Sequence, residues 1–217
     1  ALDRISLISN SDSHSPSRIG REANILDADM NYSSILEAVK SKDPKKFLMT
    51  IEFFPEEGKY HYDGHRKCQV VFEPEETQKN KGLCPVCHRP LTIGVLNRVA
   101  QIADRLMGFK PNNAVPYLSL IPLEEIIADT FGMGVGTKAV GQEYKEMINK
   151  FGNEFKILVE APKPDLERLV KTEIVEAILR VRDKRVKIEP GYDGEYGKIK
   201  IFGGAERRNL AKQSSLF

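Results

Sequence analysis

The sequence predicts an α+β fold with a small, loop-rich module near its middle and a helical C-terminal region that carries a β-hairpin. Residues 46–95 hold all three cysteines and three of the four histidines, among turns rich in Gly and Pro. Beyond residue 123, apolar side chains mostly recur at helical spacing. Residues 186–188 and 199–202 then flank the turn residues Gly191-Tyr-Asp-Gly194, as in a hairpin.

The first 45 residues read as a piece of a larger domain. Residues 4–9, which include Ile5, Leu7 and Ile8, predict a short buried strand, followed by the polar loop 10–16. No earlier element could pair with this strand. Residues 31–39 predict a helix with Ser33 or Ser34 as N-cap and Glu37 placed for a capping box.

The later elements follow from the same periodicities. We expect a strand over residues 47–54, a helix from Val95, a second helical region from Leu123 and a strand over 155–159. A helix over 137–151 has an apolar stripe and ends before Gly152, and one further helix covers 164–182. The apolar stripe of the helix over 137–151 consists of Val140, Tyr144, Met147, Ile148 and Phe151.

These elements predict four regions. They are the domain remnant at 1–45, the cysteine module at 46–95, a helical and β region at 96–205 and a tail at 206–217.

Composition excludes a membrane protein. The 217 residues are 41% hydrophobic, which suffices for a core, but no apolar run approaches the roughly 20 residues of a membrane span. The first residues lack the apolar stretch of a secretory signal, so we expect a reducing cytoplasm. Residues 180–212 hold ten Lys or Arg against five Asp or Glu, a concentration that suits phosphate binding or a solvated surface equally well.

The cysteines have the spacing of metal ligands. In Cys84-Pro-Val-Cys87, two thiolates on one tight turn can face the same tetrahedral ion, and Cys68 supplies a third ligand. His65, at a His-x-x-Cys spacing, is the favoured fourth ligand, with His61 and His88 as alternatives. We therefore expect a closed zinc site with a structural role, because it leaves no position for water.

Asp12 and His14 are a second pair of potential ligands. In an extended segment their side chains project to the same side and could hold a divalent ion. Taken alone, however, the spacing favours the alternative that Asp12 caps a turn and His14 lies at the surface. A hydrolytic centre needs at least three protein ligands, and two do not complete it.

Several residues are candidates for contacts to DNA. The segment containing Gly134, Gly136, Thr137 and Lys138 resembles the glycine turn of a helix-hairpin-helix motif, whose backbone amides hold a phosphate at a helix N-terminus. A plain interhelical turn is the alternative. The basic candidates for phosphate contacts are Arg66, Lys67, Arg182, Lys184 and Arg185, each of which could equally be surface charge.

The last five residues, Gln213-Ser-Ser-Leu-Phe217, match the short peptide by which bacterial repair proteins dock on the sliding clamp. Gln213, Leu216 and Phe217 would be the contacts, with Leu216 and Phe217 as pocket anchors.

Four segments together resemble endonuclease Q, a PHP-domain DNA repair nuclease with a zinc-binding module. They are Ser11-Asp-Ser-His14, Phe54-Pro-Glu-Glu-Gly-Lys-Tyr-His-Tyr-Asp-Gly-His-Arg-Lys-Cys68, Cys84-Pro-Val-Cys87 and Pro190-Gly-Tyr-Asp-Gly-Glu-Tyr-Gly197. The resemblance covers nearly the whole chain. It implies that residues 1–45 end a PHP domain, a distorted β/α barrel, and that the chain is a C-terminal portion.

The family's activity would be metal-dependent cleavage of DNA on the 5′ side of uracil, hypoxanthine, xanthine or abasic sites. The resemblance makes Asp12 and His14 ligands of its hydrolytic metal, which would be Zn, Mg or Mn. The other ligands should lie upstream, so we expect this chain alone to be inactive. The alternatives are a non-catalytic DNA-binding or clamp-adaptor module and a PHP phosphoesterase acting on small substrates.

Overall fold

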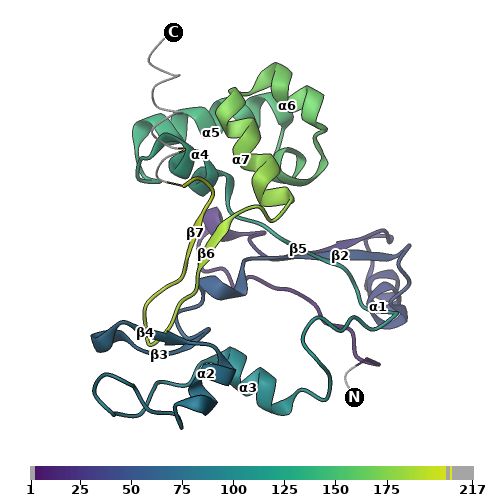
Figure 1. Ribbon diagram of the computed structural model, residues 1–217. Helices are drawn as coiled ribbons and strands as arrows, with labels where there is room; N and C mark the ends of the chain where they lie inside the picture. Colours follow the sequence, from purple (N-terminus) through teal and green to yellow (C-terminus); the bar gives the residue numbers. More distant parts are fainter. Residues whose placement is uncertain (1–2, 204–205, 207–217) are drawn as a thin grey trace. The chain divides into compact units, whose positions relative to one another are not determined.

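The chain forms two compact units in the structure, a computed structural model that describes residues 3–203 and 206 (Figure 1). Unit 1 comprises the described residues of 1–118 together with 189–198. Unit 2 comprises those of 119–188 and of 199–217. The borders expected after residues 45 and 95 fall inside unit 1, and unit 2 interrupts unit 1 in the sequence.

A small sheet in unit 1 has the strand order β1-β2-β5. β1 (Ala23–Leu26) pairs antiparallel with β2 (Phe47–Glu52), as expected for residues 47–54, and β5 (Tyr117–Ser119) completes the sheet. Phe47 and Ile51 bury their side chains from β2. The helix α1 (Tyr32–Ser41) was predicted, but its N-cap is Asn31, whose side chain accepts a 2.9 Å bond from the Ser34 N–H.

The predicted strand over residues 4–9 is wrong. The Asn24 side chain accepts from the Ser9 N–H at 3.0 Å and donates to the Ser9 carbonyl at 2.8 Å. A side-chain amide therefore takes the two backbone groups that a strand ladder would use. Ile5, Leu7 and Ile8 are exposed, and the turn η1 (Pro16–Arg18) follows.

The cysteine module of unit 1 is built around a short hairpin. β3 (Asp63–His65) and β4 (Val70–Phe72) pair antiparallel and are joined by the turn η3 (Arg66–Cys68). The buried Asp63 carboxylate accepts bonds from Gly94 N–H, the Thr77 hydroxyl and the Asn97 amide. These bonds tie β3 to α2 (Pro74–Lys79) and α3 (Val95–Ile102).

The helix predicted from Val95 is present as α3, which ends at Ile102. Val95, Val99 and Ile102 are exposed, whereas Asn97 is the buried residue of α3. The polar network around Asp63, and not an apolar stripe, fixes this helix to its unit.

A late segment of the chain completes unit 1 (Figure 1). The loop between β6 (Lys187–Glu189) and β7 (Lys198–Lys200) packs on η2 (Pro55–Glu57) and the residues after it. Gly191 N–H donates to Glu56 O at 2.7 Å and Gly197 N–H to Glu57 O at 3.0 Å. The predicted hairpin is confirmed.

Unit 2 is helical. Val140 and Met147, from the predicted stripe of α5 (Lys138–Phe151), are fully buried, and Tyr144, Ile148 and Phe151 are half-buried. The core also contains Ile126, Ile157, Leu166 and Ile178. The helices are α4 (Leu123–Phe131), α5 (Lys138–Phe151), η4 (Lys156–Glu160), α6 (Lys163–Leu169) and α7 (Thr172–Arg182).

Two expectations for unit 2 are wrong. No strand forms over residues 155–159, because Lys156–Glu160 form the π-helical turn η4, and Arg182 donates to three carbonyls in and just after this turn. The helix predicted over 164–182 is broken, because Val170 takes an extended conformation that separates α6 from α7. Within the described residues, no helix is long and apolar enough to cross a bilayer.

Candidate metal centre and nucleic-acid surface

The Cys84-to-Cys87 segment forms a tight turn that places both thiols on one side. The Cys84 N–H donates to Arg89 O and the His88 N–H donates to Cys84 O, each at 2.8 Å. His88 takes the left-handed conformation, with φ 58°, which closes the turn. The two thiols therefore have the arrangement that the Cys-x-x-Cys spacing predicts.

A second turn faces the first. β3 ends at His65, the turn η3 carries Cys68, and Gln69 takes the left-handed conformation just after it. One ligand atom from each of His65, Cys68, Cys84 and Cys87 lies within 4.8 Å of every other. Tetrahedral zinc with Zn–S bonds of about 2.3 Å places sulfur atoms about 3.8 Å apart, so these four side chains fit such an ion.

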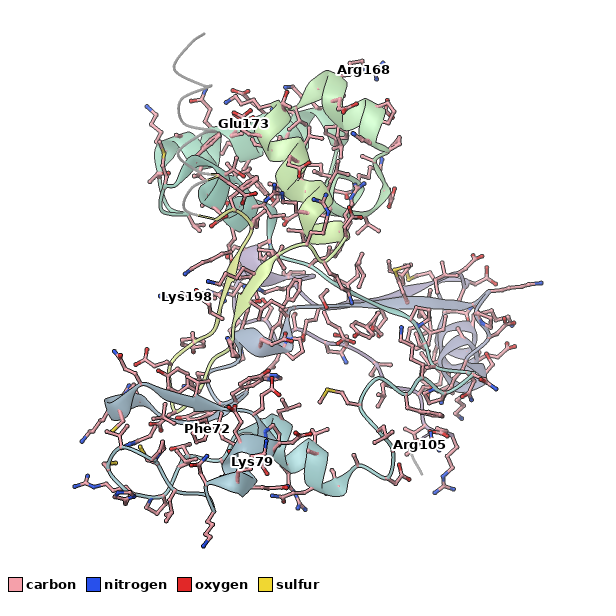
Figure 2. The ribbon with its side chains drawn as sticks, viewed as in Figure 1. Phe72, Lys79, Arg105, Arg168, Glu173 and Lys198 are labelled. Carbon is pink, nitrogen blue, oxygen red and sulfur yellow. The ribbon has the colours of Figure 1, made fainter. Side chains whose placement is uncertain are left out.

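The surroundings of the cluster favour the thiolate at Cys84, whereas burial and the neighbouring thiols of Cys87 and Cys84 raise the pKa of Cys68 to about 11. Burial alone would raise the pKa of Cys84. Bonds from the backbone N–H groups of Cys87 and Val86 and from the His65 side chain outweigh burial and lower this pKa to about 6. Val70 and Leu91 are buried beneath the cluster, and Phe72, labelled in Figure 2, packs against the same small core.

The two alternative histidines lie outside the cluster. His61 stacks on Tyr62, with ring centroids 5.3 Å apart, and burial lowers its pKa. His88 is exposed next to Cys87. The structure therefore brings only the favoured histidine, His65, to the three cysteines.

Asp12 and His14 lie in an exposed segment of unit 1, and neither joins another metal-ligating group among residues 3–203. Asp12 has φ 47°, and its carbonyl is 2.8 Å from the His14 Nδ1. A carbonyl at this distance favours the tautomer that carries the proton on Nδ1. The His14 Nε2 then has a free lone pair, as in a metal ligand.

The predicted glycine turn lies between α4 and α5. Thr137 is the N-cap of α5, and its N–H donates to Gly134 O at 3.1 Å. A Cβ added to Gly134 or Gly136 would meet no atom within 4 Å, and neither residue has positive φ. The fold of unit 2 therefore does not require glycine at these two positions. Lys138 begins the helix at an exposed position.

The five basic candidates differ in their surroundings. Arg182 is half-buried and donates to the carbonyls of Ile157, Leu158 and Ala161 at 2.7–2.8 Å, so its guanidinium has a structural role. Lys67 and Lys184 are exposed. Arg66 pairs with Glu195 at 3.4 Å, and Arg185 pairs with Glu176 and Asp183 at 3.3 Å.

Sequence reasoning did not single out Lys59, Tyr60 and Tyr196, which lie together in unit 1. The Lys59 Nζ is 5.6 Å from the Tyr60 ring centroid and 5.7 Å from that of Tyr196. The sequence feature that could have pointed to these residues is the repeated pairing of Tyr and Gly in residues 190–197. Gln213, Leu216 and Phe217 lie outside the described residues.

Comparisons with known proteins place the chain among uncharacterized relatives. Residues 122–185 match the family model described as the MJ0043 C-terminal domain. Uncharacterized protein MJ0043 of Methanocaldococcus jannaschii is 36% identical over 91% of this chain and 26% of its own length. Uncharacterized protein YqxK of Bacillus subtilis is 30% identical over 92% of this chain and 48% of its own length. The chain thus spans half or less of these relatives.

Two solved structures share the fold. The lesion-specific endonuclease PfuEndoQ from Pyrococcus furiosus aligns with a TM-score of 0.81 and 30% identity, over 92% of this chain and 50% of that one. An endonuclease Q complex with a 27-mer duplex, which carries an abasic lesion at the active site, aligns with a TM-score of 0.76 and 30% identity. That match covers 93% of this chain and 51% of the other.

Proposed function

We propose, from the fold that this chain shares with about half of endonuclease Q, that it is part of a metal-dependent DNA repair endonuclease. The observation that carries the proposal is the TM-score of 0.81 to PfuEndoQ at 30% identity over 92% of the chain. The substrate would be duplex DNA with a deaminated base or an abasic site, cleaved on the 5′ side of the lesion. The matching family model, that of a C-terminal domain, supports the assignment of a C-terminal portion.

Asp12 and His14 would be ligands of the hydrolytic centre. The Asp12 carbonyl orients the His14 ring and leaves Nε2 available for a metal. A divalent ion at such a site activates water and stabilises the charge of the phosphate transition state. Because no third ligand accompanies these two residues among the described ones, the chain by itself would lack activity.

The cluster of His65, Cys68, Cys84 and Cys87 would hold structural zinc. Its four protein ligands leave no position for substrate, and it is built on the same hairpin as the buried Asp63 network. Zinc there would stabilise the module without taking part in hydrolysis.

DNA would contact the exposed part of the glycine turn and exposed basic side chains. Gly134 and Gly136 have open space around them, which would let a phosphate approach the backbone N–H groups at the start of α5. Lys67, Lys138, Lys184 and Arg185 would contribute charge, and Arg66 would do so from its pair with Glu195.

Nicking assays on a labelled duplex with one deoxyuridine test the proposal. This chain alone should leave the duplex intact with Mg or Mn, whereas the full-length product of its gene should nick 5′ to the uracil. Asp12→Asn and His14→Ala in that product should lower the rate at least about 100-fold, because a metal ligand is lost. Robust nicking by this chain alone would contradict the incomplete centre, and no nicking by either protein would contradict the nuclease.

The tail peptide would tether the protein to a sliding clamp. Leu216→Ala with Phe217→Ala should abolish binding of the chain to immobilised clamp, because both pocket anchors are lost. Unchanged affinity would refute the tether and leave the nuclease proposal untouched.

A further inference from the structure

Two exposed tyrosines of unit 1 lie near the same lysine. Tyr60 is 47% exposed and Tyr196 is 69% exposed, yet the rings lie 5.6 and 5.7 Å from the Lys59 Nζ. The rings come from segments 136 residues apart in the sequence. The fold thus gathers aromatic surface at one place but leaves much of it in contact with solvent.

The backbone beneath these rings is fixed. Gly194 N–H donates to Lys59 O at 2.9 Å, next to the bonds that Gly191 and Gly197 make with Glu56 and Glu57. A Cβ on Gly197 would lie 2.0 Å from Glu56 O, so the loop can only approach this closely with glycine. A Cβ on Gly194 would lie 3.8 Å from the Tyr60 Oη, which places Tyr60 directly beside the loop.

The charge near the rings suits a nucleic acid backbone. The Lys59 Nζ lies within 5.7 Å of both ring centroids, and the acidic neighbour of Tyr196, Glu195, is paired with Arg66 at 3.4 Å. Lys198, labelled in Figure 2, follows Tyr196 by two residues and is exposed. A phosphate close to Tyr196 would therefore meet cations and an acid that is paired with an arginine.

We propose that Tyr60 and Tyr196, with Lys59 near both rings, form a stacking site for an unpaired nucleobase of DNA. Aromatic faces bind any base, and a lysine beside them binds the adjacent phosphate. The inference rests on the proposed nuclease function, because a lesion enzyme handles nucleotides that have left the duplex stack. Because backbone bonds already hold the two segments together, exposed rings on them can stack a base without the entropy cost of ordering a loop.

NMR on this chain with isotope-labelled tyrosine tests the site. The probes are hexathymidylate and a hexamer of abasic deoxyribose phosphates, which has the backbone but no bases. Upfield shifts of the Tyr60 and Tyr196 ring signals with hexathymidylate, and none with the abasic hexamer, are expected. Tyr32, 79% exposed at the start of α1, serves as the control signal and should not shift.

Substitutions separate stacking from structure. Tyr60→Leu and Tyr196→Leu should each weaken hexathymidylate binding roughly 5- to 100-fold, whereas Tyr60→Phe, Tyr196→Phe and Tyr32→Leu should not. Ring signals that stay unshifted at saturating oligonucleotide, or equal shifts with the abasic hexamer, would overturn the site. So would shifts caused by a proline-rich peptide and not by hexathymidylate. None of these outcomes bears on whether the full-length product nicks DNA. A failure of the stacking site is therefore distinguishable from a failure of the proposed function.

Discussion

The His65 Nδ1 lies 3.3 Å from the Cys87 Sγ, although 22 residues separate them in the sequence. The separation is close to that between two ligand atoms on one tetrahedral zinc ion. This relationship distinguishes His65 from the two other histidines of the module.

Zinc binding should therefore depend on His65 and not on its neighbours. The purified chain should contain one equivalent of zinc by elemental analysis. His65→Ala should lower zinc affinity by more than the roughly 10- to 100-fold that loss of an outer-shell partner costs, and should lower the melting temperature. His61→Ala and His88→Ala are the matched controls and should keep the metal. Less than half an equivalent in the unmodified chain would refute the site.

Gly136, in the turn between α4 and α5, and Gly197, in the loop between β6 and β7, should differ in how much substitution by alanine destabilises the chain. Gly136→Ala should change the free energy of unfolding by less than about 0.5 kcal/mol, because a Cβ there meets nothing. Gly197→Ala should cost at least about 3 kcal/mol, the upper range for overpacking. Urea unfolding measures both.

In the full-length product, Gly136→Ala should also weaken binding to an abasic duplex about fivefold, as one backbone contact to phosphate is lost. Unchanged affinity would remove the glycine turn from the DNA surface.

Arg182 and Arg185 should separate structure from DNA contact. Arg182→Met should destabilise the chain by about 2–4 kcal/mol, since three buried carbonyls lose a charged donor. Arg185→Met removes only exposed ion pairs and should cost about 0–1 kcal/mol.

The salt dependence of duplex binding gives the second readout for this pair. Arg185→Met should reduce the slope of log K against log salt by about 1, and Arg182→Met should not change it. The reverse pattern would show that Arg182 is the phosphate contact.

Alkaline pH should weaken unit 2 through Tyr144. Burial, followed by the nearby Glu154 carboxylate, raises the pKa of Tyr144 to about 12. The Tyr144 hydroxyl donates to Glu154 at 3.1 Å, and the other Glu154 oxygen accepts from the Leu123 N–H. Because ionisation is harder in the folded chain than in the unfolded one, stability is retained below about pH 10 and lost as pH rises toward 12.

Tyr144→Phe removes this titration. Its free energy of unfolding should fall less between pH 9 and 11 than that of the unmodified chain, although the lost hydrogen bond makes it about 1 kcal/mol less stable at pH 8. Parallel curves for the two proteins would contradict the assignment.

The cluster of metal-ligating side chains and most helices could be predicted because their signals are local. Cys84 and Cys87 share one turn, and the Val140 and Met147 stripe lies on one helix. The expectation for residues 4–9 was wrong because the apolar run itself says nothing about Asn24, which holds Ser9 from 15 residues away.

Other features depend on contacts between distant segments. The single helix expected over 164–182 breaks at Val170. Neither neighbour of Val170 is Gly or Pro, so the sequence has no stop signal there. The segment 155–159, expected as a strand, becomes helical where the Asn153 side chain accepts from the Lys156 N–H and Arg182 donates to the carbonyls. Asp193 is another residue whose contact with a distant segment could not be predicted from a local pattern. It accepts from the Thr92 hydroxyl 101 residues away, which lowers its pKa and fixes the late loop to the module.

The return of residues 190–197 to the cysteine module has a consequence for biosynthesis. A ribosome makes β3, both cysteine turns and all of residues 119–188 before it makes the segment that packs on residues 56–66. Zinc could bind the nascent module early, but its final packing waits until Lys198 has left the exit tunnel. A nascent chain that stops before Pro190 would expose Gly64 and the backbone of Glu56 and Glu57. Protease sensitivity of such truncated chains would therefore report when the module closes during translation.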